Sequence, residues 1–166
     1  MKYRAINAII NKQDVSPHYT QGTIKEVLPM IQLVCGKQGA GKTKQLIDMA
    51  NTLAKTNDGH IVYVDADQSQ IFRLDYSIRL VQTAEYPLKT SSEFFGFVCG
   101  ILSQDYDINT VFIDGLLKNA KIDADKMGAL LDRVAEVAER YNIHFIISMS
   151  CDENEIPEKY QSCLIQ

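Results

Sequence analysis

From residue 30 onward, short runs rich in β-branched residues alternate with segments whose apolar residues recur at helical spacing. This alternation constrains the fold most, because units of strand, helix and strand align their strands in parallel and pack the helices on the sheet. Strands are expected at residues 31–35, 61–64, 110–113 and 143–149, with a weaker one at 78–81. We therefore predict an α/β fold in three layers, with a mostly parallel sheet of about four to five strands flanked by helices.

Helices are expected between these strands. Residues 42–55 form the first by the spacing of their apolar side chains. Thr90 and Glu93 match a capping box that opens a second helix, which runs to Leu102. Asp123 is expected to cap a third helix, which extends to Tyr141. Residues 151–166 have a weaker pattern and are expected to contain a short helix and an edge segment.

The chain has 166 residues, of which 46% are hydrophobic, so one domain can bury a core without help from disulfide bonds. Residues 1–29 differ from the rest, because they are polar, weakly periodic and interrupted by Pro17, Gly22 and Pro29. We predict an N-terminal appendage of uncertain structure at residues 1–29, followed by one folded domain at residues 30–166.

Charge and cysteine usage exclude several classes of protein. The formal net charge is −4 and no run of Lys or Arg is present, so we expect no strong nucleic-acid binding. No apolar stretch approaches the roughly 20 residues of a membrane span, and no secretory signal follows Met1. Cys35, Cys99, Cys151 and Cys163 lack the spacing of a metal site, which indicates buried thiols in a reducing compartment. We expect a cytoplasmic protein without a membrane anchor.

A glycine-rich segment lies between the first expected strand and the first expected helix and fits the pattern G-x-x-x-x-G-K-S/T. Gly36, Gly39 and Gly41 allow the backbone N–H groups to turn inward without Cβ atoms in the way. The following helix start adds unpaired N–H groups and the positive end of its dipole. The pattern therefore predicts a phosphate-binding loop and the three-layer P-loop NTPase fold. The expected nucleotide-binding residues are Gly36, Lys37, Gln38, Gly39, Ala40, Gly41, Lys42, Thr43 and Lys44.

Individual roles follow from the chemistry of ATP and Mg²⁺, the expected ligand and ion. Lys42 is expected to contact the β- and γ-phosphates as a catalytic residue, and the Thr43 hydroxyl to bind Mg²⁺. Asp114 ends an apolar strand, as in the Walker B arrangement, and is expected to act as a second metal-binding and catalytic residue. A turn-capping role for Asp114 is the alternative.

The residue after Asp114 is Gly115, where many ATPases of the additional-strand class carry a glutamate that orients the attacking water. A catalytic base must therefore come from elsewhere. Asp65 and Asp67 follow the second strand, at the edge where open α/β sheets bind ligands, and Asp67 is included in the predicted catalytic set. Solvated or turn-capping aspartates are the alternative reading of both.

Four further positions are weaker candidates. Ser148 and Ser150 end the strand expected beside the loop strand, where a polar side chain can sense the γ-phosphate. Arg73 and Arg79 follow the second strand and would meet phosphate or a partner protein, or lie on the surface.

Segments 36–44, 93–102 and 113–117, with Asp65 and Asp67, resemble a group of small bacterial ATP-binding P-loop proteins. Some of that group carry a twitching-motility label, which implies a hexameric motor. The separate N-terminal domain and the acidic and histidine boxes of such motors are not visible in this sequence. Residues 37–43 are also similar to the deviant loop of partitioning ATPases, although Gln38 stands where that loop usually has glycine. The resemblance covers residues 30–165 and implies ATP binding, but no particular reaction.

We expect a Mg²⁺-dependent small ATPase or nucleotide switch, with slow or partner-stimulated hydrolysis. The alternatives are a nucleoside or small-molecule kinase, with an acceptor pocket between Asp67 and Tyr86, and a module that binds ATP without hydrolysing it. No guanine-reading N-K-x-D motif occurs, which favours ATP over GTP. A nucleoside triphosphate is therefore the expected ligand, and a protein partner or homo-oligomer stays open.

Overall fold

The strands that the sequence predicts form one parallel sheet in the computed structural model, which describes residues 30–66, 69 and 71–165. The predicted appendage at residues 1–29 lies outside the described residues. The five strands are ordered β1-β5-β4-β2-β3, and every neighbouring pair is parallel, which confirms the predicted α/β sheet. Their bounds are β1 Ile31–Cys35, β2 His60–Asp65, β3 Arg79–Gln82, β4 Ile108–Ile113 and β5 His144–Met149.

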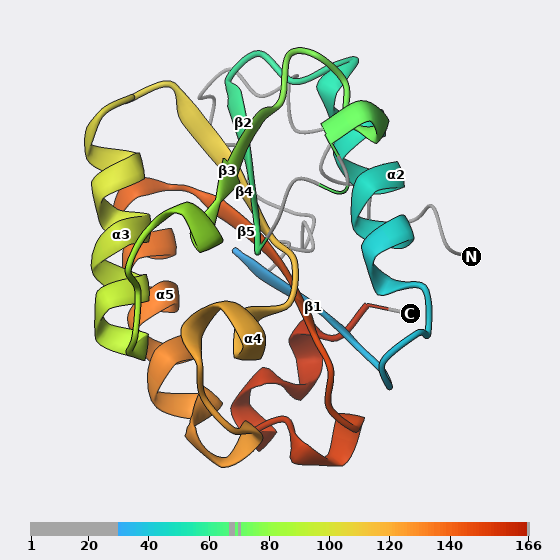
Figure 1. Ribbon diagram of the computed structural model, residues 1–166, viewed down its shortest axis with the longest axis vertical. Helices are drawn as coiled ribbons and strands as arrows, with labels where there is room; N and C mark the ends of the chain where they lie inside the picture. The colour runs from blue at the N-terminus through green and yellow to red at the C-terminus, as the bar shows by residue number, and fades with distance from the viewer. Residues whose placement is uncertain (1–29, 67–68, 70, 166) are drawn as a thin grey trace, which may run out of the picture.

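Helices cover both faces of this sheet and complete three layers (Figure 1). One face carries α2 (Lys42–Ala54), and the other carries α3 (Ser91–Ser103), α4 (Leu116–Ala120) and α5 (Met127–Tyr141). Figure 1 shows α3 and α5 on one side of the sheet and α2 on the other. Crossover connections are required because the strands are parallel, so the chain must return to the same end of the sheet before the next strand begins.

The hydrophobic core has two parts, one on each face of the sheet, because successive strand residues point to opposite sides. Ile61, Phe112 and Ile146 belong to the part beneath α2, and the residues that follow each of them belong to the part beneath α3 and α5. Leu46 and Leu131 are fully buried in the two parts. Each large side chain buried in this way stabilises the fold by about 1.5–3 kcal/mol before entropy is counted.

Helix ends agree with the sequence in one case and correct it in another. Thr90 Oγ1 accepts the Glu93 N–H and Glu93 Oε2 accepts the Thr90 N–H, both at 3.2 Å, which confirms the predicted capping box of α3. The Asp123 side chain makes no capping hydrogen bond, and a 3₁₀ turn at Ala124–Lys126 precedes α5. The long helix therefore begins at Met127, later than predicted.

The C-terminal segment contains 3₁₀ turns at Glu153–Glu155 and Glu158–Cys163 and then lies beside β1. Leu164 forms a parallel bridge with Leu33, and the Ile165 N–H donates to the Leu33 oxygen at 2.9 Å. These contacts confirm the expected edge segment, which satisfies backbone groups on the outer edge of β1. Among the described residues, no helix is long and apolar enough to cross a membrane.

Candidate functional site

The glycine-rich loop connects the end of β1 to the start of α2 at the carboxyl edge of the sheet (Figure 1). Gly39 and Gly41 have φ angles of 83° and 87°, in the left-handed region that costs other residues about 1–2 kcal/mol. The Ala40 N–H donates to the Lys37 oxygen at 3.1 Å and closes a turn within the loop. Glycine therefore occupies positions where the loop conformation requires it.

The start of α2 carries backbone donors that have no partner among the residues described by the structure. Gly41 caps the helix without a side-chain hydrogen bond, and the first turn has no acidic residue. The N–H groups of Lys42 and Thr43 have no acceptor within the described part of the chain, as expected for the first residues of a helix. Free donors and an uncompensated positive dipole end are the features that bind anions.

The Lys42 side chain folds back over the loop. Its Nζ donates to the Gly36 oxygen at 2.7 Å and to the Lys37 oxygen at 2.9 Å. An ammonium group has three donors, so one remains after these two bonds. Gly36, Lys42 and Thr43 are half-buried, whereas the remaining predicted contacts are exposed, namely Lys37, Gln38, Gly39, Ala40, Gly41 and Lys44.

Polar side chains replace apolar ones where β2, β4 and β5 reach the carboxyl edge. Strand residues two apart face the same side, and the residue two before each of Asp65, Asp114 and Ser148 belongs to the core beneath α2. Val64 pairs with Ile113, and the Asp114 N–H donates to the Val64 oxygen at 2.8 Å. Asp65 and Asp114 therefore occupy adjacent positions on the face covered by α2, the helix that the glycine loop opens.

Both carboxylate oxygens of Asp114 are held by hydroxyl donors, and the residue is 7% exposed. Ser148 Oγ donates to Oδ1 at 2.6 Å, and Tyr63 Oη donates to Oδ2 at 3.0 Å. Burial of Tyr63 and the adjacent Asp114 carboxylate raise the pKa of the phenol, so it stays protonated and donates. Each carboxylate oxygen keeps acceptor capacity for a further ligand.

Ser148 uses its hydroxyl both as donor, to Asp114, and as acceptor, from the residue after Asp114. The hydroxyl accepts the Gly115 N–H at 2.7 Å, and the side chain is fully buried. The structure thus assigns Ser148 to holding Asp114, on the strand next to β1 as the sequence predicted. Ser150 is exposed, and its expected role as a phosphate sensor stays a prediction.

The network extends to two residues that the sequence analysis did not select. Asn119 of α4 donates from Nδ2 to the backbone oxygen of Asp114 at 2.7 Å and to the backbone oxygen of Gly115 at 3.0 Å. Its Oδ1 accepts the Thr83 hydroxyl at 2.5 Å. No sequence pattern identifies Asn119 or Thr83. Tyr63 could have been identified, because the period of two along β2 places it on the same face as Asp65.

The remaining candidates from the sequence are Asp65, Asp67, Arg73 and Arg79, of which Arg79 begins β3 and therefore lies at the opposite edge of the sheet from the glycine loop. Asp65 is half-buried, and its Oδ1 accepts the Ala66 N–H at 2.6 Å. Asp67 lies outside the described residues, so its catalytic role stays a prediction. Arg73 and Arg79 are exposed, and contact with phosphate or a partner stays a prediction for both.

Two of the four free cysteines lie close to the glycine loop. Cys35 ends β1 directly before Gly36, and its Sγ lies 3.9 Å from Sγ of Cys151. Burial, followed by the neighbouring Cys151, raises the pKa of Cys35 to about 12. The thiol is therefore protonated near neutral pH. Cys151 and Cys163 are buried as predicted, whereas Cys35 and Cys99 are only half-buried.

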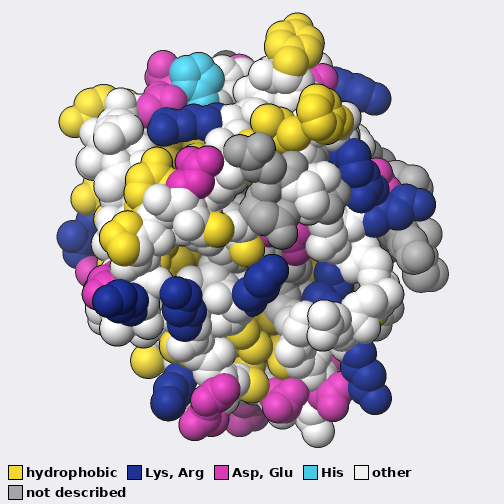
Figure 2. Space-filling model, viewed as in Figure 1, with side chains coloured by type: hydrophobic (Ala, Val, Ile, Leu, Met, Phe, Trp, Pro, Cys, Tyr) yellow, Lys and Arg dark blue, Asp and Glu magenta, His cyan; other side chains and the backbone are white. Residues whose placement is uncertain are grey.

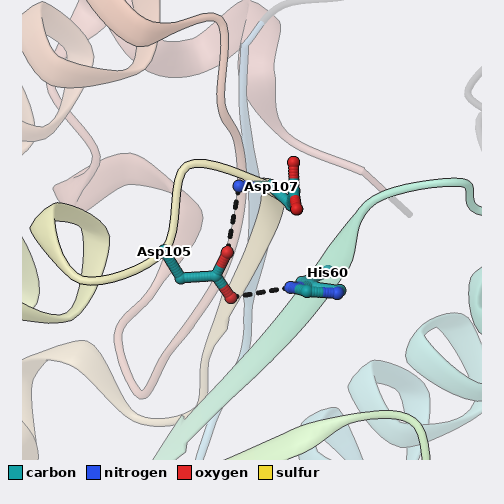
Figure 3. A group of neighbouring side chains, drawn as sticks. All are labelled: His60, Asp105 and Asp107. Carbon is teal, nitrogen blue, oxygen red and sulfur yellow. Dashed lines mark hydrogen bonds and ion pairs between the residues drawn. The ribbon is translucent and has the colours of Figure 1, made fainter.

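A different polar cluster lies at the opposite edge of the sheet, where β2 begins (Figure 3). His60 Nδ1 pairs with Asp105 Oδ2 at 2.7 Å, and the Asp107 N–H donates to Asp105 Oδ1 at 3.0 Å. Ligand atoms of all three side chains lie within 4.8 Å of one another. His60 and Asp107 are exposed and Asp105 is half-buried, and the length of the strands separates this group from Asp114, so it is not part of the glycine-loop site.

Comparison with known families and curated proteins adds no assignment. No family model matches the chain, and no curated protein matches it. The function must therefore be argued from the loop, the polar network and their chemistry.

Proposed function

We propose that this protein is a Mg²⁺-dependent ATP-binding protein of the P-loop NTPase type, acting as a small ATPase or nucleotide switch. One juxtaposition carries the proposal. A glycine loop that opens a helix with free N–H donors lies at the same sheet edge as the fixed Asp114 carboxylate. Donors for a polyphosphate and an acidic oxygen for its metal ion are both needed to bind a nucleoside triphosphate.

The phosphates would bind to the N–H groups at the start of α2. Lys42 Nζ, which now donates to the carbonyl oxygens of Gly36 and Lys37, would exchange these acceptors for phosphate oxygens. Phosphate oxygens carry negative charge, so the hydrogen bonds that replace the neutral ones are stronger. Lys42 is thus kept over the loop before the nucleotide arrives.

The oxygen donors near the loop suit Mg²⁺, which prefers hard oxygen ligands and retains several waters. The half-buried Thr43 hydroxyl follows the loop directly, and Asp114 offers a buried carboxylate. Mg²⁺ bound there would neutralise charge on the β- and γ-phosphates. The Tyr63 and Ser148 hydroxyls would keep the Asp114 carboxylate oriented to help hold the ion.

Slow hydrolysis is expected because Gly115 supplies no carboxylate beside Asp114. Asp65, in the adjacent strand position, is the described carboxylate best placed to orient a water molecule. A base at Asp65 would lie one strand farther from the loop strand β1 than a base directly after Asp114, because β2 follows β4 in the strand order. A partner that completes the site would then raise the rate.

Incubation of the full chain with ATP and Mg²⁺, with phosphate and ADP measured over time, tests this proposal. We expect slow phosphate release without an acceptor, and a lower rate in Asp65→Asn. The matched control is Asp58→Asn, in the exposed turn after α2, which should retain the rate. ADP formation only when nucleosides are added would identify a kinase, and ATP binding without turnover would identify a binding module. Absence of ATP binding contradicts the proposal.

A further inference from the structure

A cavity of about 300 Å³ lies next to the Asp114 network, on the side of α4. The segment after β3 forms one wall, and α4 with its C-terminal cap forms the other. The lining residues are Thr83, Ala84, Tyr86, Leu88, Lys118, Asn119 and Lys121. This volume is at the small end of ligand pockets, so the cavity suits a molecule of mononucleotide size or below.

The charge of the lining is positive. Lys118 lies in α4, and Lys121 is the C-terminal cap of this helix; both line the cavity. No Asp or Glu is among the described residues that line the cavity. Figure 2 shows Lys and Arg side chains gathered across the middle of the face on which α4 lies.

The two lysines retain donors for a ligand. Lys118 is exposed and has no hydrogen-bond or ion-pair partner in the described part of the chain. Lys121 Nζ donates to the Leu88 oxygen at 2.5 Å across the cavity, which leaves two of its three donors. Lys121 also has φ 53°, a conformation that residues other than glycine and asparagine rarely adopt.

The cavity lining also includes a buried polar side chain and an aromatic ring. Asn119 is 4% exposed and is held by Thr83 and by the backbone of Asp114 and Gly115. Tyr86 packs against Phe97 with ring centroids 4.6 Å apart, while 46% of its surface remains exposed. The lining thus offers two cations and an aromatic ring next to the residue that fixes the Asp114 backbone.

We propose that this cavity is a second ligand site, for a small organic oxyanion, and that its occupancy is sensed at Asp114 through Asn119. Two lysines supply point charges for a phosphate or carboxylate group, and Tyr86 supplies a surface for a flat or apolar part of the ligand. The site does not depend on nucleotide binding at the glycine loop. Tyr86 also bounded the acceptor pocket expected from the sequence, whose other limit, Asp67, lies outside the described residues.

The test is an NMR titration of the ¹⁵N-labelled full chain carrying Lys42→Ala, so that the glycine loop does not take up the anions. The ligands are inorganic phosphate, adenosine monophosphate and succinate, with uncharged adenosine as the charge control. We expect the amide signals of Ala84, Lys118, Asn119 and Lys121 to shift with the anions and the Gly115 signal to follow. Adenosine monophosphate should bind more tightly than inorganic phosphate, because only the former has a ring for Tyr86.

Lys118→Gln combined with Lys121→Gln should weaken anion binding at least about tenfold, because the charge-assisted bonds are lost. The control is Lys126→Gln, in an exposed turn outside the cavity, which should leave the affinity unchanged. Tighter binding of inorganic phosphate than of succinate, neither of which has a ring for Tyr86, would identify the ligand as a phosphate, and the reverse as a carboxylate. The site is refuted if no anion shifts these signals at about 10 mM, well above a millimolar dissociation constant, or if adenosine binds equally well. Undiminished binding by the double variant also refutes it.

Discussion

Asp114 is the residue on which the candidate site depends most. Its carboxylate accepts hydrogen bonds from Ser148 and Tyr63, and its backbone oxygen accepts one from Asn119. A buried carboxylate is costly unless its oxygens are paired, so these donors explain how an acidic side chain with 7% exposure is tolerated. The same donors fix the direction in which the carboxylate can accept a further hydrogen bond.

Ser148→Ala should destabilise the protein, because it removes a donor to Asp114 and leaves the Gly115 N–H without its acceptor. We expect a loss of about 1–3 kcal/mol in the free energy of unfolding, measured with urea. Ser150→Ala is the matched control, since Ser150 is exposed, and should change stability by less than about 0.5 kcal/mol. Equal stability of the two variants would show that the hydroxyl of Ser148 does not support Asp114.

His60 should titrate above its ordinary pKa of 6.5, because Asp105 accepts its hydrogen bond and Asp105 and Asp107 add negative charge. The pKa of Asp105 is lowered from 3.8, chiefly by the hydrogen bond to His60. The raised His60 pKa stabilises the fold fully below pH 6.5, and this contribution is lost as pH rises through the folded-state value. The lowered Asp105 pKa contributes above pH 3.8 and is lost at more acidic pH.

An NMR titration of the His60 ring checks this expectation in two variants. Asp105→Asn should bring the midpoint down towards the ordinary value, because the hydrogen-bonded charge is removed. Asp107→Asn should lower it less, since Asp107 acts only through its charge. If Asp105→Asn leaves the midpoint unchanged, the pair in Figure 3 does not form in solution.

At the scale of elements, the connection from β1 to α2 is the feature on which the proposed nucleotide site depends. It is short, it contains glycines in the left-handed region, and it begins a helix without an acidic residue or a side-chain cap. A helix that needed only stability would place Ser, Thr, Asp or Asn at this cap. The use of glycine at position 41 leaves the first N–H groups of α2 available.

Substitution of two glycines by alanine should have opposite effects on stability. Gly41→Ala should cost about 1–2 kcal/mol, because φ at this position is 87° although a Cβ would meet no atom within 4 Å. Gly100→Ala, within α3 and equally free of contacts, should stabilise the protein by about 0.5–1 kcal/mol. Urea unfolding measures both. A stabilising effect of Gly41→Ala would mean that the loop does not adopt the described conformation.

The sequence predicted most elements because their patterns are local. All strands lie within a few residues of the expected ranges, and the weak pattern at 78–81 corresponds to β3. The short helix α4 was not predicted, since five residues span little more than one turn and show no periodicity. The delayed start of α5 was also missed, because a 3₁₀ turn and a helical turn have nearly the same apolar spacing.

The candidate site could be predicted only in part, because only the glycine loop is contiguous in the sequence and the other residues come from separate elements. The glycine loop is contiguous, so its pattern and its position between strand and helix were visible in the sequence. Tyr63, Asn119 and Ser148 meet Asp114 across three different elements, and their partnership depends on strand order. Strand order is set by tertiary packing, which no single segment encodes.

At the scale of the molecule, strand order brings the loop and Asp114 to one edge. β5 lies between β1, which precedes the loop, and β4, which ends at Ile113 directly before Asp114. The chain leaves β1 towards α2 on one face and leaves β4 towards α4 on the other. In open α/β sheets, ligands bind at the carboxyl ends of strands where the connections diverge in this way.

Equilibrium calorimetry with ATP in the presence of Mg²⁺ tests the central claim most directly. We predict saturable binding to the unmodified chain, weakened at least about tenfold by Lys42→Ala because charge-assisted bonds to phosphate are lost. The control is Lys55→Ala, at the exposed C-terminal cap of α2, which should bind ATP like the unmodified chain. Absence of any binding heat, or equal affinity of the Lys42→Ala variant, would contradict the proposal that the loop at residues 36–44 binds a nucleoside triphosphate.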